Sequence, residues 1–225
     1  MLRRLLGLIG YVGLFAAALF IPAGTIHWRA AWILLGVLFT VRATSAVLLQ
    51  RAQPGLLAER ARFPIQRGQI VADRVLLLAS MASFAAVIVF ASVDRWHLHL
   101  LADPPRSLRA AGLAAFGAGW WIVHLALTAN AFAVTVVRYQ AERGHVVADR
   151  GPYRFVRHPF YAGLPFVLVG LALWLGSFAA AVASAVPLGI LVIRIVHEER
   201  MLRARLDGYD AYAARVRWRV VPGIW

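Results

Sequence analysis

Six mostly apolar stretches divide the chain, and short polar or proline-containing segments separate them. A helix that crosses about 30 Å of hydrocarbon needs roughly 20 apolar residues, fewer where the bilayer thins. The stretches are Leu5 to Ile21, Ala30 to Gln50, Val75 to Val93, Ala110 to Val137, Tyr161 to Gly176 and Phe178 to Val196. The pattern predicts an all-α, polytopic membrane helix bundle of about six transmembrane helices.

The composition agrees with a membrane protein. Apolar residues make up 61% of the 225 residues, against roughly 45–50% in a soluble domain. The chain has no cysteine, which excludes disulfides and thiolate chemistry, and its histidines lack the acids that would complete a metal site. The net charge is +14, but no soluble basic domain is present to read nucleic acid. We therefore expect membrane lipids as partners, and neither nucleic acid nor metal.

The arginines favour one side of the predicted bundle. With a cytoplasmic N-terminus, 18 of the 24 arginines fall in cytoplasmic segments and four in outer loops, while Arg42 and Arg194 lie within or at the edge of spans. Cytoplasmic loops of membrane proteins carry the excess of positive residues. We expect a multi-pass protein with both termini in the cytoplasm.

The candidate chemistry lies in the second half of the chain. Residues 1–129 are expected to form four N-terminal spans, the fourth continuing to about Val137. Residues 130–225 collect polar and aromatic residues at one membrane face, and we expect a loop, a C-terminal helical hairpin and an interfacial tail. The tail predicts a helix that passes the membrane and closes at Gly208, followed by aromatics such as Tyr212 and Trp218. These aromatics lie flat at the interface or cover a recess as a lid.

The start of the fifth predicted helix is a candidate anion site. Pro159 suits the first helical position, where its missing N–H is not needed, so the helix begins at His158-Pro159. The free N–H groups of such a helix start attract a carboxylate or phosphate, and Arg154 and Arg157 stand close by. An alternative places these arginines at lipid phosphates while His158 caps the helix.

Two adjacent glutamates, Glu198 and Glu199, stand out in a chain with only 10 acidic residues. The fifth helix is short for a full span, so a polar recess at membrane depth is one interpretation of this end of the hairpin. The alternative pairs Arg194 with Glu198 and Glu199 with Arg203 at the i, i+4 spacing, where each pair is worth a few tenths of a kcal/mol.

Other polar or glycine positions in the fourth predicted helix carry weaker signals. Gly117 and Gly119 follow no strand, so we expect close helix packing there and no dinucleotide site. His124 and Asn130, at membrane depth, are candidates either for function or for interhelical hydrogen bonds.

Motifs in the second half of the chain resemble those of a known family. Arg157-His158-Pro159-Phe160-Tyr161-Ala162-Gly163, followed by Glu198-Glu199, resembles the RHPxYxG and EE pattern of isoprenylcysteine carboxyl methyltransferases and related phospholipid methyltransferases. The stretch from His145 to Tyr153 resembles the H-x-L-V-x-x-G-x-Y segment of that family, and Gly208 to Tyr212 resembles its G-x-x-Y tail.

The resemblance implies an integral membrane methyltransferase with a cytoplasmic pocket for S-adenosyl-L-methionine at the end of the last helix pair. The residues that it assigns to the cofactor, including the motif arginine, are Gln140, His145, Val146, Val147, Ala148, Tyr153, Arg157, His158, Pro159, Phe160, Tyr161 and Glu199. It also implies a substrate-binding arginine near the glutamates, for which Arg194 is the candidate. We expect Arg194, Glu198 and His158 to act in catalysis.

The chemistry of methyl transfer fits these residue types. The cofactor carries a sulfonium, an ammonium and a carboxylate; Glu198 or Glu199 supplies negative charge for the first two, and the helix start or the arginines bind the third. Transfer mainly requires alignment of the reactants and exclusion of water, so a nucleophilic triad is not needed. An amine acceptor must lose a proton, with His158 or a glutamate as the nearby base, whereas a carboxylate or thiolate needs none.

The acceptor and two other classes of function stay open. A hydrophobic or lipid-like acceptor is expected to enter from the bilayer, and an isoprenylated cysteine carboxylate, a phospholipid amine and a small thiol or acid are all compatible. A transporter or a non-catalytic lipid-binding protein is the second class, although a transporter would be expected to carry polar interruptions in both halves. A membrane reductase is the third class, and it would need room for a nicotinamide dinucleotide.

Overall fold

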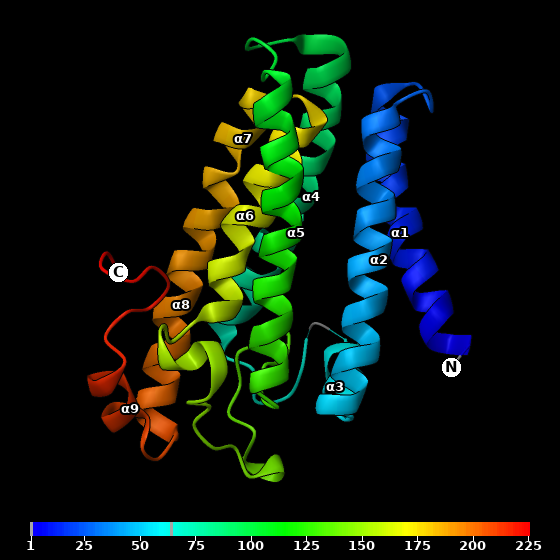
Figure 1. Cartoon of the computed structure of the whole chain (residues 1–225). Coiled ribbons are helices and arrows are strands. Elements are labelled where there is room, and N and C mark those ends of the chain that lie inside the picture. Colours follow the sequence, from blue (N-terminus) through cyan, green and yellow to red (C-terminus); the bar gives the residue numbers. More distant parts are fainter. Residues whose placement is uncertain (1, 64) are drawn as a thin grey trace.

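The computed structural model describes residues 2–63 and 65–225, which form a bundle of helices that run up and down (Figure 1). Its long elements are α1 (Leu2–Ala23), α2 (Arg29–Ala52), α4 (Val71–Val93), α5 (Arg106–Ala129), α6 (Pro159–Leu175), and α7 (Phe178–Ala183) continued by α8 (Ala185–Arg205). Within these described residues, five spans are long and apolar enough to cross a membrane, and α6, with 17 residues, is a shorter apolar helix. The prediction of an all-α membrane bundle is confirmed.

Short elements close the two ends of the bundle. The N-terminus and four short elements lie at the lower end in Figure 1, and a π-helical turn, η1 (Asp94–Leu98), lies at the upper end. The four lower elements are α3 (Leu56–Arg60), the 3-10 turns η2 (Ala141–Arg143) and η3 (Gly151–Arg154), and α9 (Tyr209–Arg215). The lower end therefore holds most of the non-helical chain, between α5 and α6.

The fourth span is shorter than predicted, because α5 ends at Ala129 and does not continue to about Val137. The side-chain oxygen of Asn130 accepts a hydrogen bond from the backbone N–H of Phe132 at 2.8 Å, and this local bond competes with helix continuation. Beyond it, the Ile70 backbone N–H donates to the Val137 carbonyl at 3.3 Å. The apolar run from 130 to 137 is thus an irregular segment of turns and bends, and its last residues, Val136 and Val137, are buried.

The last hairpin is divided differently from the prediction. Helix α6 begins at Pro159 with His158 as its N-cap, as the sequence predicts. The returning helix is interrupted at Ser184, because Pro187 has no N–H to donate to the carbonyl of residue 183, where α7 ends. Helix α8 then continues to Arg205, past the predicted end of the span, and Gly208 at φ +80° starts α9.

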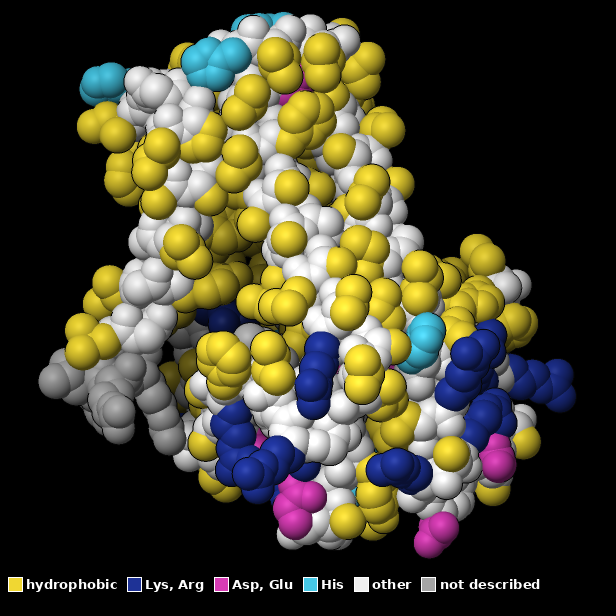
Figure 2. Space-filling model, turned by 180° about the vertical axis from the view of Figure 1, so that it is seen from behind, with side chains coloured by type: hydrophobic (Ala, Val, Ile, Leu, Met, Phe, Trp, Pro, Cys, Tyr) yellow, Lys and Arg dark blue, Asp and Glu magenta, His cyan; other side chains and the backbone are white. Residues whose placement is uncertain are grey.

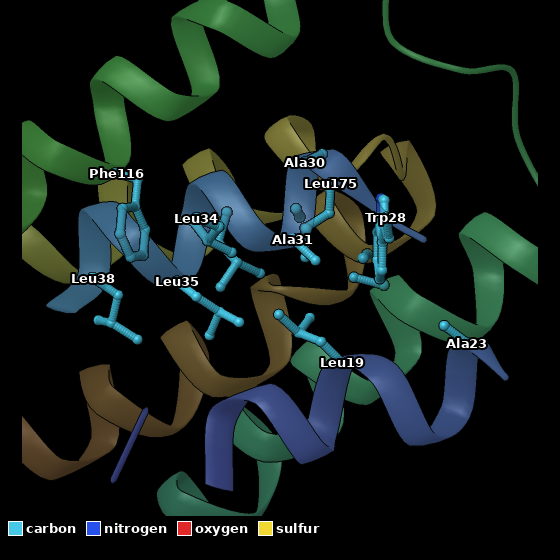
Figure 3. Packing of buried hydrophobic residues seen from close by; sticks show 14 of the residues in the cluster. Leu19, Ala23, Trp28, Ala30, Ala31, Leu34, Leu35, Leu38, Phe116 and Leu175 are labelled. Atoms are coloured by element: carbon cyan, nitrogen blue, oxygen red, sulfur yellow. The ribbon is translucent and has the colours of Figure 1, made fainter. Parts of the chain in front are cut away.

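The main apolar core lies toward the upper end of the bundle. Figure 3 shows Leu19 of α1 close to Leu34, Leu35 and Leu38 of α2, with Phe116 of α5 beside them. These five side chains are at most 5% exposed. The Ser92 hydroxyl also donates to the Leu19 carbonyl and ties α1 to α4. This packing seals the upper end and leaves the lower end for a cavity.

Glycines bring α5 and α6 into backbone contact. A Cβ built on Gly119 would stand 2.6 Å from the Gly163 carbonyl oxygen, and one on Gly163 would stand 2.5 Å from the Gly119 carbonyl oxygen. Gly112 and Gly170 repeat the arrangement one heptad away. Gly117, by contrast, has open space around it. Small residues at a helix crossing let membrane helices approach this closely, so the packing role expected of this region belongs to Gly119.

We expect Gly119→Ala to destabilise the protein by about 1–3 kcal/mol, since its methyl group has no room between the two backbones. Gly117→Ala is the matched control in the same helix, and we expect it to leave the stability unchanged or slightly raised. Thermal unfolding of both variants in detergent measures the difference. Equal melting temperatures for the two variants would contradict the close approach of α5 and α6.

Candidate active site

A cavity of about 480 Å³ extends from the lower end of the bundle to membrane depth. Small-molecule sites in proteins usually measure roughly 300–1,000 Å³. Its walls come from α1, α3, α4, α5, α6, α8 and α9, and from residues 132–138 and 145–148. Elements from both halves of the chain therefore enclose it.

One part of the cavity, which we term the apolar arm, is lined by α1, α4 and α5. Its residues are Tyr11, Leu14, Phe15, Ala18, Leu77, Ser80, Met81, Phe84, Ala85, Ile88, Phe116 and Trp120. The rear face of the molecule is hollowed beside α1, and apolar side chains border the hollow (Figure 2). The arginines visible on that face gather at the lower end (Figure 2). The apolar arm thus lies at the depth of the spans, away from the charged end.

The other part, the polar end, gathers most of the residues that the sequence singles out. Those that line the cavity are His145, Val146, Val147, Ala148, Tyr153, Arg157, His158, Phe160, Tyr161, Arg194 and Glu198. Gln140, Pro159 and Glu199 are buried but do not line it. Gln140 instead braces the loop, because its side-chain amide donates to the Phe132 carbonyl at 2.8 Å and its side-chain oxygen accepts from Arg143.

The two adjacent glutamates have different surroundings. The Glu198 carboxylate faces the cavity and accepts a hydrogen bond from the Tyr161 hydroxyl at 2.8 Å. Within the described residues, no Arg or His nitrogen lies within 4 Å of it. Glu199, 3% exposed, instead lies 2.6 Å from Arg157 Nε and 2.9 Å from Arg219 Nε. The carboxylate that is available to a ligand is therefore Glu198.

Neither of the i, i+4 ion pairs considered from the sequence forms. Arg194 Nε lies 2.7 Å from an oxygen of Asp73, which is fully buried on α4, and Arg203 pairs with Asp210. Asp73 also accepts from the Val137 backbone N–H at 2.8 Å. Its two oxygens thus hold α8 and the irregular segment 130–137 against α4, and they fix the Arg194 guanidinium in the cavity wall.

Asp73 is the residue that sequence reasoning missed. It lies just before the third predicted span, in the first turn of α4, where an acidic residue is ordinarily read as a helix-start preference. Acidic residues are rare in this chain, which has only 10 of them, so Asp73 is as unusual in the sequence as the two glutamates. Only its partner, 121 positions away, marks it as part of the site.

The C-terminal tail is fastened to the polar end through Arg157. The guanidinium donates to the carbonyls of Val216 and Arg217, each at 2.8 Å. The backbone N–H groups of Arg157 and His158 donate to the carbonyls of residues 218 and 219 at 2.9 and 2.8 Å. The anion site expected from Arg157 is thus largely satisfied within the protein, and the tail covers this side of the helix start.

Helix α9 covers the mouth of the polar end. Tyr209 and Tyr212 both line the cavity and are buried, and the Tyr212 hydroxyl donates to the Tyr153 carbonyl at 2.9 Å. The expectation that Tyr212 lies flat at the membrane interface is wrong, because α9 turns this ring inward. Burial raises the pKa of both rings above the ordinary tyrosine value, so they are neutral at physiological pH.

His145 lies between two aromatic rings at the rim of the cavity. Its ring centroid is 4.5 Å from that of Phe132 and 5.7 Å from that of Tyr139. Burial, together with the positive charges of Arg143 and Arg138, lowers the pKa of His145 to about 4. The imidazole is therefore neutral at physiological pH and offers a flat, uncharged surface.

The remaining polar residues of α5 make hydrogen bonds within the protein. His124 Nδ1 lies 2.9 Å from the Ser45 hydroxyl of α2, as expected of an interhelical bond. The Asn130 amide donates to the Tyr153 hydroxyl at 3.2 Å and holds that ring in the cavity wall. Within residues 2–63 and 65–225, no three His, Cys, Asp or Glu side chains gather as a metal site requires.

A comparison with protein families finds a match for the part of the chain that contains the last helical hairpin. Residues 108–206 match the phospholipid methyltransferase family. This segment is therefore similar to the group of membrane methyltransferases that the motifs resemble. A search of the curated proteins found no match. The matched segment spans α5 to α8 and includes the polar end, whereas α1 to α4 lie outside it.

Proposed function

We propose that this protein transfers a methyl group from S-adenosyl-L-methionine to a hydrophobic acceptor that enters from the bilayer. The observation that carries the proposal is the free carboxylate of Glu198 in a cavity whose other arm lies at membrane depth. A cavity with a charged end and an apolar arm suits two ligands of different polarity. The family match over residues 108–206 supports the same reaction class.

The polar end has the donors and acceptors that the cofactor requires. S-Adenosyl-L-methionine, when bound, supplies a methyl group that is already activated by its sulfonium. Glu198 is available to the positive groups, because no Arg or His nitrogen within the described residues lies within 4 Å of its carboxylate. His145 offers a neutral ring at the rim for a flat group such as a nucleobase.

The residues around the cavity serve mainly to align two ligands and exclude water. Asp73 holds Arg194 in the wall, and Tyr161 holds Glu198, so both charges are fixed before a ligand arrives. Preorganised groups of this kind lower a barrier by several kcal/mol without covalent catalysis. His158 Nε2 lies 3.2 Å from a Glu199 oxygen, which leaves Glu198 as the base that faces the cavity if the acceptor is an amine.

We propose a membrane orientation that agrees with the same arrangement. The polar end lies with the N-terminus, α9 and the gathered arginines (Figures 1 and 2). An excess of arginine marks the cytoplasmic side, which is also where a water-soluble cofactor is made available. Both termini are then cytoplasmic, and the acceptor reaches the site laterally through the hollow beside α1.

Calorimetric titration of the detergent-purified protein with S-adenosyl-L-methionine tests the cofactor assignment. The wild type is expected to bind, and Glu198→Gln is expected to bind about tenfold more weakly or worse, because a charge-assisted contact is worth roughly 1.5–3 kcal/mol. Asp210→Asn, on the exposed ion pair with Arg203, is the matched control and keeps the wild-type affinity. Absence of binding by the wild type, or equal binding by Glu198→Gln, would contradict the assignment.

A further inference from the structure

Arg60, at the end of α3, places a positive charge in the cavity wall. One guanidinium nitrogen donates to the Ala133 carbonyl at 2.6 Å, and the guanidinium carbon lies 5.2 Å from the centre of the Phe160 ring. Within the described part of the chain, no carboxylate oxygen lies within 4 Å of Arg60. The adjacent carboxylate, Glu59, is directed to Arg62 and Arg138.

Arg42 provides a second positive charge next to the apolar arm. Its guanidinium carbon lies 4.6 Å from the centre of the Tyr11 ring and 5.1 Å from that of Trp120, and both rings line the apolar arm. Its position ten residues before the end of α2 corresponds to about 15 Å along the helix, well within the span. Among residues 2–63 and 65–225, Arg42 likewise has no carboxylate within 4 Å.

The two guanidinium groups are close enough to influence each other. Burial, together with the positive charge of Arg42, lowers the pKa of Arg60 to about 10, so Arg60 is still protonated at neutral pH. A charge held in an apolar site without a counter-charge is costly, and such residues in membrane proteins usually mark a ligand site. An anion placed between the polar end and the apolar arm would relieve this cost.

The position of the two arginines in the chain distinguishes them from the cofactor residues. Arg42 and Arg60 belong to α2 and α3, which lie outside the matched segment 108–206. The residues assigned to the cofactor by resemblance all lie between Gln140 and Glu199. The arginines are therefore contributed by the N-terminal half, together with the α1 and α4 side chains that form the apolar arm.

We propose that Arg60, supported by Arg42, binds an anionic group, a carboxylate or a phosphate, on the lipid-like methyl acceptor. The apolar chain of that acceptor occupies the apolar arm. The acceptor is thus an amphiphilic anion, and a neutral lipid of the same chain length is a poor ligand. The identification of this ligand as the methyl acceptor rests on the proposed function, whereas the binding of an anionic amphiphile does not.

Direct binding of oleate to the detergent-purified protein, without cofactor, tests the inference. Unlabelled oleate is expected to displace radiolabelled oleate at least tenfold better than methyl oleate, which has the same chain without the charge. Lysophosphatidate is compared with monooleoylglycerol in the same way, and the anion that competes better identifies the preferred group. If neither anion competes better than its neutral counterpart, the inference is overturned.

Variants of Arg60 connect this preference to the site. Arg60→Gln is expected to weaken oleate binding about tenfold, since it removes one charge-assisted contact. Arg60→Lys keeps the charge and is expected to retain most of the affinity. Arg62→Gln, on the exposed partner of Glu59, is the matched control and binds like the wild type. Thermal unfolding of each variant verifies folding, and wild-type oleate binding by folded Arg60→Gln rules the site out.

A titration of Arg60→Gln with S-adenosyl-L-methionine separates this inference from the proposed function. Unchanged cofactor affinity with weakened oleate binding supports an acceptor site. Weakened cofactor affinity with unchanged oleate binding overturns it and assigns Arg60 to the carboxylate of the cofactor. The wild type could also bind oleate in an Arg60-dependent manner without binding the cofactor. That result would support the anion site and contradict the proposed function.

Discussion

Replacing Asp73 by alanine is expected to destabilise the protein by about 3–5 kcal/mol, the usual effect of removing one partner of a buried ion pair. The carboxylate is fully buried and accepts hydrogen bonds from Arg194 Nε, the Val137 backbone N–H and the Gln69 side chain at 2.7–2.8 Å. Its loss leaves the Arg194 guanidinium, itself 7% exposed, without a counter-charge. Activity is expected to be lost with it, because the cavity wall is no longer fixed.

Thermal unfolding in detergent measures the effect of Asp73→Ala, and a loss of this size corresponds to a melting temperature lowered by roughly 10 °C. Asp149→Asn, which removes an exposed carboxylate paired with Arg215, is the control and is expected to change stability little. The double variant Asp73→Ala/Arg194→Ala, which leaves no unpaired charge, is expected to lose less than the sum of the two single losses. Additive losses would show that the two side chains do not stabilise each other.

Replacing Glu199 by alanine is the second change with a large expected effect, also about 3–5 kcal/mol. Its carboxylate contacts Arg157, His158 and Arg219 at 2.6, 3.2 and 2.9 Å. Arg157 in turn holds the backbone of residues 216 and 217. Without Glu199, Arg157 keeps only neutral partners, so we expect the tail beyond α9 to detach from α6.

Limited trypsin digestion distinguishes a detached tail from general unfolding. In Glu199→Ala, cleavage after Arg217 and Arg219 is expected to become fast while the helical part of the chain stays resistant at low temperature. Glu142→Ala, at an exposed carboxylate paired with Arg138, serves as the control and keeps the wild-type pattern. A wild-type pattern in Glu199→Ala would contradict the proposed role of this glutamate in fastening the tail.

The effects of Glu198 and Glu199 substitutions are expected to differ in kind. Glu198 has a single hydrogen-bond donor, the Tyr161 hydroxyl, within the described residues, so its exchange for glutamine mainly lowers ligand affinity. Glu199 has three partners and supports the structure around Arg157. The assignment of Glu199 to direct cofactor contact remains a prediction from resemblance, and the geometry favours a positioning role for it.

Many residues that line the polar end of the cavity could be singled out from the sequence, because their signals are local. Pro159 marks the start of α6, since proline fits the first helical turn, and the motif residues around it line the cavity. Gly119 could be assigned to helix packing because close approach of two helices is the main contribution of a glycine inside an apolar span. Each of these conclusions depends on residues within one or two turns of each other.

The sequence could not predict contacts between residues that are far apart in the chain. Whether Arg194 pairs with Glu198 or with Asp73 depends on how α4 and α8 pack, and both partners are chemically equivalent. The apolar run from 130 to 137 satisfies the helical pattern, but it forms an irregular segment. Asn130 binds the backbone at its start, and Asp73 and Ile70 bind the backbone of Val137 at its end.

The sequence by itself determined that this is a helical membrane protein with its motif residues at the arginine-rich end, because the apolar period and the charge distribution are properties of each segment alone. Only the tertiary structure decided which glutamate faces the cavity, which arginines lack a carboxylate within 4 Å among the described residues, and that the N-terminal helices line part of the cavity. The physical reason is that whether a charge is neutralised depends on all of its neighbours in space. Those neighbours come from segments that are far apart in the sequence.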